Sequence, residues 1–397
     1  MRILHIVGTV SPAAGGPSEV IRTLVRYAPP DIESEVATID DPAAPFLAGF
    51  PCPVHALGRA PISSGKNPRQ RWYNPALTQW LTANRTRFDG VIVHGLWQYT
   101  GFAAWRCLRA TREHPATPYV VFPHGMLDPY FKRAHPAKHF KKYIYWHLIQ
   151  SRVLRQAQRV LFTTEVERDL ALQTFRPARW KPLVVAIGAE APPPNTEDLL
   201  LAFYGNCPQL RGERFLLFLG RIDRKKGCDL LLHAFAALSP ADPDLHLVIA
   251  GPDPTNWRAT LEPFITASGL SHRIHWPGML QGDAKWGAFA ACEAFILPSH
   301  QENFGIAVVE ALASAKPVLI TLPINISLEI AADNAGFVEP DTYEGVTKLI
   351  VDWLKTSDDQ RRAMSTAALA TFQRRYDIRK NAETILRVFA QKSPQTV

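Results

Sequence analysis

Two carboxylates stand in the segment ENFGIAVVEALA, where Glu302 follows an apolar run and Glu310 lies inside the next one. We expect a helix over residues 304–314, with Asn303 as its N-cap. All neighbours of Glu310 in that helix are apolar, and a helix that is apolar on all sides is buried. A buried carboxylate is costly unless hydrogen bonds satisfy it, and the two hydroxyl groups of a ribose would be suitable donors. A glutamate on an ordinary helix surface would need a polar face, which this helix lacks.

Cations gather in the segment LGRIDRKKG, directly after another apolar run. Arg221, Lys225 and Lys226 are flanked there by Gly220 and Gly227. A solvated loop would have the same composition. At the carboxyl end of a buried strand, however, these charges would suit a diphosphate, because each charge-assisted hydrogen bond contributes about 1.5–3 kcal/mol.

The first apolar run is followed by the loop GTVSPAAGG and a helical stretch. Gly15 and Gly16 precede this helix, whose first turn has backbone N–H groups that can bind an anion. The spacing is not that of the dinucleotide-binding motif G-x-G-x-x-G, so Asp40 and Asp41 are interpreted as turn residues. The alternative to a phosphate site is an ordinary strand–helix turn capped by Ser18.

Two histidines end apolar runs: His94 in VIVHG and His124 in VVFPHG. A single histidine at a strand end is more often structural than functional. Two of them at the carboxyl ends of separate parallel strands would face the same cleft. Each is therefore a candidate for a polar contact or for proton transfer.

These residues follow short apolar runs that alternate with helical stretches, a pattern typical of βαβ units and a parallel sheet. We expect strands at residues 2–7, 90–93, 119–122, 159–162 and 183–187, and then at 215–219, 245–250, 273–276, 294–297 and 317–321. The predicted fold is α/β, with two Rossmann-like domains that face each other across a cleft. Ligands of open α/β sheets bind beyond the carboxyl ends of the strands, where the candidate residues lie.

The 397 residues are enough for two domains. Residues 188–198 have the sequence GAEAPPPNTED, and three consecutive prolines are typical of a linker. We expect an N-terminal domain over 1–190, a linker over 191–205, a C-terminal domain over 206–375, and a C-terminal helix and tail over 376–397.

The formal net charge of +8 is concentrated in the first half of the chain, which holds 24 Lys and Arg against 15 Asp and Glu. The excess is greatest in residues 129–159, which contain eight Lys or Arg, six Phe, Tyr or Trp, and no acidic residue. This composition suits an anionic membrane surface, an RNA, or a solvated face over an aromatic core. We place the membrane slightly ahead of the solvated face, and RNA last, because no RNA-binding module is recognisable.

Several classes of protein are disfavoured. No apolar run approaches the roughly 18–20 residues of a membrane-spanning helix, and the opening MRILHIVGTV is interpreted as a strand and not as a signal peptide. The five cysteines form no C-x-x-C pair, so no disulfide framework or zinc site is expected. The D-x-D segment Asp242–Asp244 precedes a strand and is interpreted as a turn. We expect a cytoplasmic protein with no metal and no cofactor.

At these motifs the sequence resembles retaining glycosyltransferase family 4, whose members have the GT-B fold. The resemblance covers essentially the whole chain, although Ala315 stands where the family often has Gly. Its motifs are Gly220-Arg221 with Lys226-Gly227, LHLVIAG at residues 245–251, and the E-x7-E pair Glu302 and Glu310. The resemblance implies that the C-terminal helix packs back on the N-terminal domain.

The resemblance also implies a UDP- or GDP-linked sugar donor and a lipid-linked or polysaccharide acceptor, as in lipopolysaccharide assembly at the inner face of a membrane. Arg221 and Lys226 would neutralise the diphosphate, Glu310 would hold the ribose, and Glu302 would contact the donor sugar. His124 would touch the same sugar. Further donor contacts are expected from Gly15 or Gly16, Gly278, Met279, Leu280, Asn303, Phe304 and Gly305.

Family members transfer the sugar with retention of configuration, and they need neither an enzyme nucleophile nor a metal. Two alternatives stay open. One is a sugar-nucleotide epimerase of the same fold. The other is a non-catalytic basic module that binds nucleotides or nucleic acid, although no nucleic-acid partner is expected.

Overall fold

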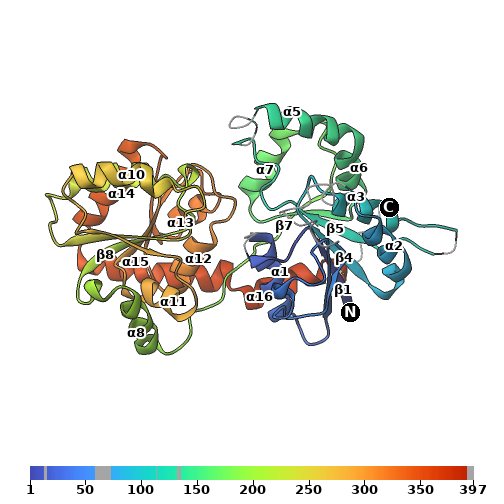
Figure 1. Ribbon diagram of the computed structural model, residues 1–397, viewed down its shortest axis with the longest axis horizontal. Helices are drawn as coiled ribbons and strands as arrows, with labels where there is room; N and C mark the ends of the chain where they lie inside the picture. Colours follow the sequence, from blue (N-terminus) through green and yellow to red (C-terminus); the bar gives the residue numbers. More distant parts are fainter. Residues whose placement is uncertain (13–15, 59–72, 113, 131, 133–135, 391–397) are drawn as a thin grey trace. The chain divides into compact units, whose positions relative to one another are not determined.

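The structure is a computed structural model that describes residues 1–12, 16–58, 73–112, 114–130, 132 and 136–390. The chain forms two compact units. The first comprises Met1–Ile187 and the C-terminal segment that begins at Ile378, and the second comprises Gly188–Asp377. Each unit has its own parallel sheet, against which helices pack (Figure 1).

The sheet of the first unit has seven strands in the order β3-β2-β1-β4-β5-β6-β7, and every pair is parallel. Its central strands are buried, because helices cover both faces of a parallel sheet and leave neither face to solvent. The strands are β1 (Arg2–Val7), β2 (Glu33–Thr38), β3 (Val54–Ala56), β4 (Gly90–His94), β5 (Tyr119–Phe122), β6 (Arg159–Phe162) and β7 (Pro182–Val184).

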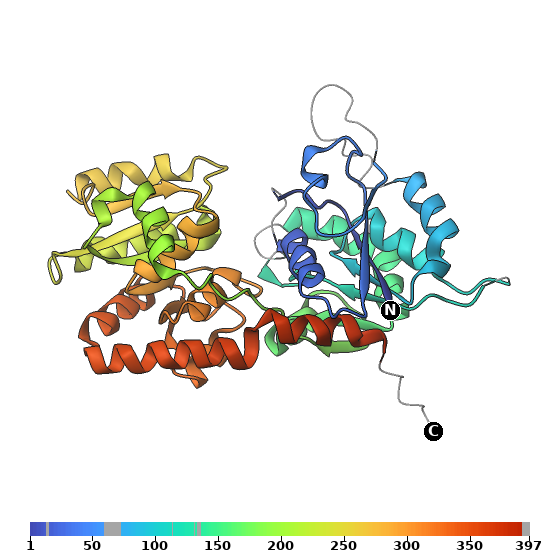
Figure 2. The same cartoon turned by 90° about the horizontal axis from the view of Figure 1, so that it is seen from below.

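The helices of the first unit connect these strands, and the last one returns from the end of the chain. They are α1 (Gly16–Arg26), α2 (Pro75–Asn84), α3 (Tyr99–Cys107), α5 (Pro136–Tyr145), α6 (Ser151–Gln156), α7 (Glu165–Thr174) and α16 (Ile378–Leu386). Helix α16 packs beside α1 (Figure 2). Arg387, just after α16, pairs with Asp31 at 2.9 Å. The expected return of the C-terminal helix is therefore confirmed.

The second unit has a six-stranded parallel sheet in the order β10-β9-β8-β11-β12-β13. Its strands are β8 (Arg214–Leu219), β9 (Leu245–Ala250), β10 (Ile274–Gly278), β11 (Ala294–Leu297), β12 (Val318–Thr321) and β13 (Gly336–Glu339). Its helices are α8 (Thr196–Asn206), α9 (Cys228–Leu238), α10 (Trp257–Ala267), α11 (Gly282–Ala291), α12 (Ile306–Ala313), α13 (Ser327–Ala332), α14 (Tyr343–Lys355) and α15 (Asp358–Thr371).

Two Rossmann-like parallel-sheet units confirm the predicted fold class, and most strand positions agree with the sequence pattern within two residues. Two segments differ. The predicted linker overlaps α8, which buries Leu199 and Phe203 against α11. Contact there is so close that a Cβ on Gly287 would lie 1.9 Å from the carbonyl oxygen of Leu199, so only glycine fits. Residues 140–157 have a pattern that predicts one continuous helix, but a π-helical turn, Trp146–Gln150, lies between α5 and α6 and buries both of its end residues.

Candidate active site

The loops that follow β8 and β11 meet at the carboxyl edge of the second sheet, because these two strands are neighbours. The backbone N–H of His300 donates to the carbonyl of Lys225 at 2.8 Å, and the hydroxyl of Ser299 donates to the same carbonyl. Gly227 has φ +66°, and a Cβ there would lie 2.1 Å from the carbonyl oxygen of Pro298. Glycine is therefore required for the two loops to approach.

Lys226 and Glu302 form an ion pair between these loops. Their side chains are only 14% and 19% exposed. Burial alone would raise the pKa of Glu302, but Lys226, Lys225 and Arg221 outweigh it and hold the pKa below its usual value. The backbone N–H of Glu302 donates to Pro323 at 3.0 Å, which fixes the loop against the segment after β12. The site is thus a cluster of three cations around one carboxylate.

Arg221 is the most exposed of these cations, with 59% of its side chain accessible. Its guanidinium lies 3.5 Å from the carboxylate of Asp223, in the same loop. The pKa of Lys225 is lowered, and burial of its ammonium is the largest of several causes. An exposed arginine beside two partly buried lysines leaves positive charge accessible to an anionic ligand.

Glu310 lies in α12, and its carboxylate accepts a hydrogen bond from the ammonium of Lys285 at 2.7 Å. Its side chain is 14% exposed, in a helix that buries six of its eight residues. Lys285 belongs to α11 and stacks its ammonium 4.7 Å from the ring centroid of Trp286. The carboxylate of Glu310 thus already has one partner, Lys285, in the protein itself. Sequence reasoning missed this lysine, because a single lysine in a helix carries no pattern.

The turn before α12 differs from the prediction in where the helix begins. The N-cap is Gly305, with φ +76°, and not Asn303. The left-handed conformation favours glycine, so the chain enters the helix two residues later than expected. Phe304 is 5% exposed, and its ring packs edge-on against Tyr376 at 5.6 Å.

The segment after β10 also lies at the carboxyl end of its strand. Gly278 has φ +75°, and its carbonyl accepts from the N–H of Gly251 at 2.7 Å. Met279 is 60% exposed, whereas Leu280 is buried. Met279 thus presents an exposed apolar surface at this edge of the sheet.

In the first unit, His94 and His124 lie within hydrogen-bond distance, as two neighbouring strand ends would place them. Nδ1 of His94 is 3.0 Å from Nε2 of His124. Sequence reasoning missed His5, in the middle of β1, whose Nδ1 lies 3.0 Å from Nε2 of His94. A histidine inside an apolar strand gives no signal until the register of β1 and β4 is known.

Gly16 is the first residue of α1 and is exposed. Gly15 lies outside the described residues. Ser18 lies inside the helix and donates its hydroxyl to the carbonyl of Val10 at 2.7 Å, so it does not cap α1. Asp40 accepts from the N–H of Val10 and from the hydroxyl of Thr38, both at 2.8 Å, which agrees with its interpretation as a turn residue.

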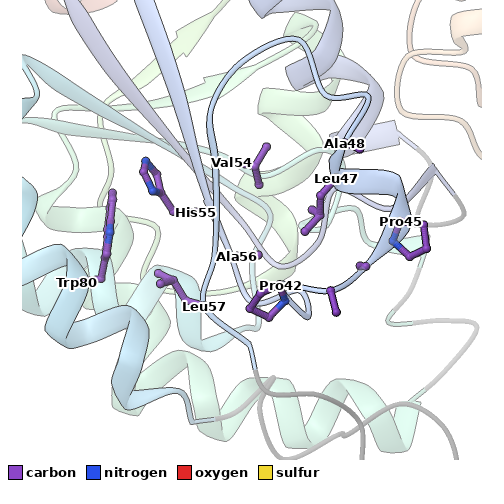
Figure 3. Close-up of a pocket in the computed structure, with 11 residues that line it drawn as sticks. Pro42, Pro45, Leu47, Ala48, Val54, His55, Ala56, Leu57 and Trp80 are labelled. Carbon is purple, nitrogen blue, oxygen red and sulfur yellow. The ribbon is translucent and has the colours of Figure 1, made fainter.

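A cavity of about 720 Å³ lies elsewhere in the first unit, between the loop after β2 and strand β3 (Figure 3). Pro42, Pro45 and Leu47 line one side. On the other side the rings of His55 and Trp80 have centroids 4.4 Å apart and are tilted by 37°. None of the predicted site residues lines this cavity.

The D-x-D segment lies at the amino end of β9, where Asp242 pairs with Arg214 at 3.0 Å. Within the described ranges, no group of three or more His, Cys, Asp or Glu side chains could hold a metal ion. In the same ranges, no helix is long and apolar enough to cross a membrane.

Two family descriptions match adjoining parts of the chain. "Glycosyl transferase 4-like domain" matches residues 15–188, and "Glycosyl transferases group 1" matches residues 208–371. The chain is 25% identical over 388 residues to a GDP-mannose:cellobiosyl-diphosphopolyprenol alpha-mannosyltransferase of Xanthomonas campestris, covering 96% of this chain and 94% of that protein. It is 26% identical to the mannosylfructose-phosphate synthase of Agrobacterium fabrum, but over only 46% of this chain and 41% of that protein.

Solved structures show the same fold. A sucrose-phosphate synthase from Thermosynechococcus elongatus superposes with a TM-score of 0.76 at 18% identity, covering 98% of both chains. HepE from Anabaena, solved in complex with UDP, superposes with a TM-score of 0.75 at 18% identity, covering 98% of this chain and all of that one.

Proposed function

Because this chain belongs to the family 4-type glycosyltransferases with the GT-B fold, we propose that it transfers a hexose, with retention, from a UDP- or GDP-linked donor to a lipid-linked or polysaccharide acceptor. One observation carries the proposal. Lys226 pairs with Glu302 at the carboxyl edge of the second sheet, Lys225 and Arg221 also act on its charge, and a second largely buried carboxylate, Glu310, lies in the next helix.

The cations would act on the leaving group. When the bond between the anomeric carbon and the phosphate oxygen breaks, its electron pair passes to the diphosphate. Arg221 and Lys226 would stabilise that charge, and electrostatic stabilisation of a developing charge is usually the largest single contribution to catalysis. The acceptor oxygen would form the new bond on the same face of the sugar, and its proton would pass to an oxygen of the departing phosphate. This step needs no metal and no enzyme nucleophile.

The remaining residues of the site would bind the rest of the donor. Glu310 would accept hydrogen bonds from the ribose hydroxyls, and Glu302 would contact the sugar. Met279, exposed after β10, suits contact with the flat face of a base. We also assign donor contacts to His124 and Gly16 of the first unit.

We propose that α5 attaches the protein to an anionic membrane at its cytoplasmic face, where a lipid-linked acceptor would be found. Helix α5 and the turn after it expose Phe140, Ile144 and Leu148 to solvent by 65%, 49% and 59%. Spacings of four residues put such side chains close to one face of a helix. Lys138 and Lys141 are exposed beside them. An exposed apolar row flanked by lysines is typical of helices that lie in a membrane interface. Residues 131 and 133–135 of the basic segment lie outside the described part of the chain.

The acceptor class is supported by the relative from X. campestris, whose name gives a diphosphopolyprenol-linked acceptor. A test combines purified protein with UDP-glucose, UDP-galactose, GDP-mannose and ADP-glucose, each with a polyprenyl-diphosphate glycan acceptor, and identifies products by mass spectrometry. A product one hexose heavier supports the proposal. An isomerised nucleotide sugar would indicate an epimerase, and binding without turnover of any donor would indicate a binding module.

A further inference from the structure

Three histidines of the first unit form a hydrogen-bonded chain from the core to the surface. His5 is 0% exposed and His94 is 1% exposed, whereas His124 keeps part of its surface accessible. Both nitrogen–nitrogen distances are 3.0 Å. Adjacent rings stack with centroids 5.3 and 5.2 Å apart, so the chain is continuous.

The outer ring is fixed in place by its surroundings. The ring of His124 stacks on Phe122 with a centroid distance of 4.3 Å and an interplanar angle of 17°. Its backbone has φ +52°, an uncommon conformation for a residue other than glycine. The next residue, Gly125, donates its N–H to the buried carboxylate of Glu167 at 2.8 Å. Stacking on Phe122 and the hydrogen bond that anchors the following residue thus hold the ring of His124 in one orientation.

The hydrogen count of the chain permits two arrangements. Burial lowers the pKa of His5 to about 4 and that of His124 to about 3, and it lowers the pKa of His94 well below its usual value. All three rings are therefore neutral near pH 7, and each carries one N–H. Two of these hydrogens form the two bonds, so the third lies on Nε2 of His5 or on Nδ1 of His124.

The two ends of the chain differ in environment. Nε2 of His5 is buried and has no hydrogen-bond partner among the described residues. A buried N–H without an acceptor is rarer in proteins than an acceptor with an unused lone pair. The hydrogen is therefore favoured at Nδ1 of His124, the ring nitrogen that takes no part in the chain.

We propose that His5 and His94 are positioning residues that hold His124 as the neutral tautomer with hydrogen on Nδ1, so that His124 donates a hydrogen bond to an oxygen of the donor sugar and does not act as a base. His5 donates to His94, and His94 donates to Nε2 of His124. The inference rests on the proposed role of His124, but the tautomer is a property of the free protein.

The tautomer is tested by NMR on the full chain labelled with ¹⁵N-histidine, without nucleotide. Signals are assigned from the variants His5→Phe, His94→Phe and His124→Phe. We expect hydrogen on Nδ1 and none on Nε2 in all three rings, unchanged from about pH 5 to about pH 8. Hydrogen on Nε2 of His124, or titration of its ring in that range, would overturn the proposal.

The coupling is tested in the same spectra with His94→Phe, which removes the donor to His124. The signals of His124 should then report a mixture of tautomers, and His94→Gln should restore the single tautomer in part through its amide N–H. His114→Phe, at an exposed histidine, is the matched control and should change nothing. An unchanged His124 tautomer in folded His94→Phe protein would refute the positioning role.

Turnover of UDP-glucose and GDP-mannose gives the functional arm. His94→Phe should lower kcat/KM about tenfold, as expected for one hydrogen bond, and should cause no further loss in a His124→Phe background. Independent, additive losses would contradict action through His124. If neither donor is turned over by the wild-type protein, the proposed function is in doubt, while the NMR result still decides the tautomer.

Discussion

The ammonium of Lys226 pairs with the carboxylate of Glu302 across the two loops that follow β8 and β11. The residues are 76 positions apart in the sequence, and the parallel order of the strands brings them together. A carboxylate at this point orients the lysine and also lowers the positive charge that it presents. The activity of the site therefore depends on what each of these charges does when a diphosphate binds.

Removal of either diphosphate cation should slow transfer strongly. We expect Lys226→Ala and Arg221→Ala each to lower kcat about 100–1,000-fold, as for loss of one electrostatic contact to a developing charge. Steady-state kinetics with the preferred donor measure the effect. Arg362→Ala, at an exposed arginine in α15 with an ion pair to Asp359, is the control and should retain full activity.

Of the parts of the bound nucleotide, Glu310 should contact only the ribose hydroxyls. Glu310→Gln should weaken the binding of UDP or GDP about tenfold, because a carboxylate accepts hydrogen bonds more strongly than an amide does. Calorimetry with the 2′,3′-dideoxy nucleotide provides the internal control, since that ligand has no ribose hydroxyls. Equal loss of affinity for both ligands would show that Glu310 does not bind the ribose.

Gly227 should be intolerant of any side chain. Gly227→Ala places a Cβ 2.1 Å from the carbonyl oxygen of Pro298 at a left-handed φ, so we expect a loss of about 2 kcal/mol or more in the free energy of unfolding. Chemical denaturation measures it. Gly205→Ala in α8, where an added Cβ meets nothing within 4 Å, should be neutral or stabilising.

Acid should destabilise the first unit through its buried histidines. The pKa of His5 and that of His124 are lowered by burial from 6.5 to about 4 and about 3, so the unfolded chain binds more protons than the folded one between these values. Stability is then full above about pH 6.5 and falls as the pH drops towards 4. Thermal unfolding should show this fall, and His5→Phe should make it shallower. If the thermal stability of His5→Phe falls with pH as steeply as that of the wild-type protein, His5 does not contribute to the acid sensitivity.

Membrane attachment should depend on both charge and apolar contact. Lys138→Glu with Lys141→Glu should reduce binding to liposomes that contain anionic lipid, and Phe140→Ser with Ile144→Ser should reduce it at any salt concentration. Co-sedimentation measures both. Lys355→Glu, at an exposed lysine of the second unit, is the control. If liposome binding changes neither in the double lysine variant nor with salt concentration, an electrostatic contribution is excluded.

Most of the fold could be predicted from sequence, because the central parallel strands are short apolar runs. Strands β3 and β13 gave no such signal, since each has only three or four residues and includes a polar one. Arg221, Lys226 and Glu302 could be chosen, since polar residues directly after buried strands must reach the carboxyl edge of the sheet. Lys285 and His5 could not. Their contacts with Glu310 and His94 depend on helix placement and strand register, which no local pattern records.

The prediction of Asn303 as the N-cap of α12 was wrong for a related reason. Asn303 has the side chain of a good cap, but the left-handed turn at Gly305 delays the helix. The break at Trp146–Gln150 also had no signal in the sequence, because its residues fit an uninterrupted helix equally well. In both places the backbone conformation, and not residue preference, determines where the helix runs.

The central claim is that a nucleotide sugar binds at the cations after β8 and is cleaved there. Its most direct test is ¹H NMR of donor hydrolysis without acceptor, using UDP-glucose, UDP-galactose, GDP-mannose and ADP-glucose in turn. We predict slow release of the α-anomer from one α-linked UDP- or GDP-sugar, lost in Lys226→Ala. Release of the β-anomer, or release that is unchanged in Lys226→Ala, would contradict the account.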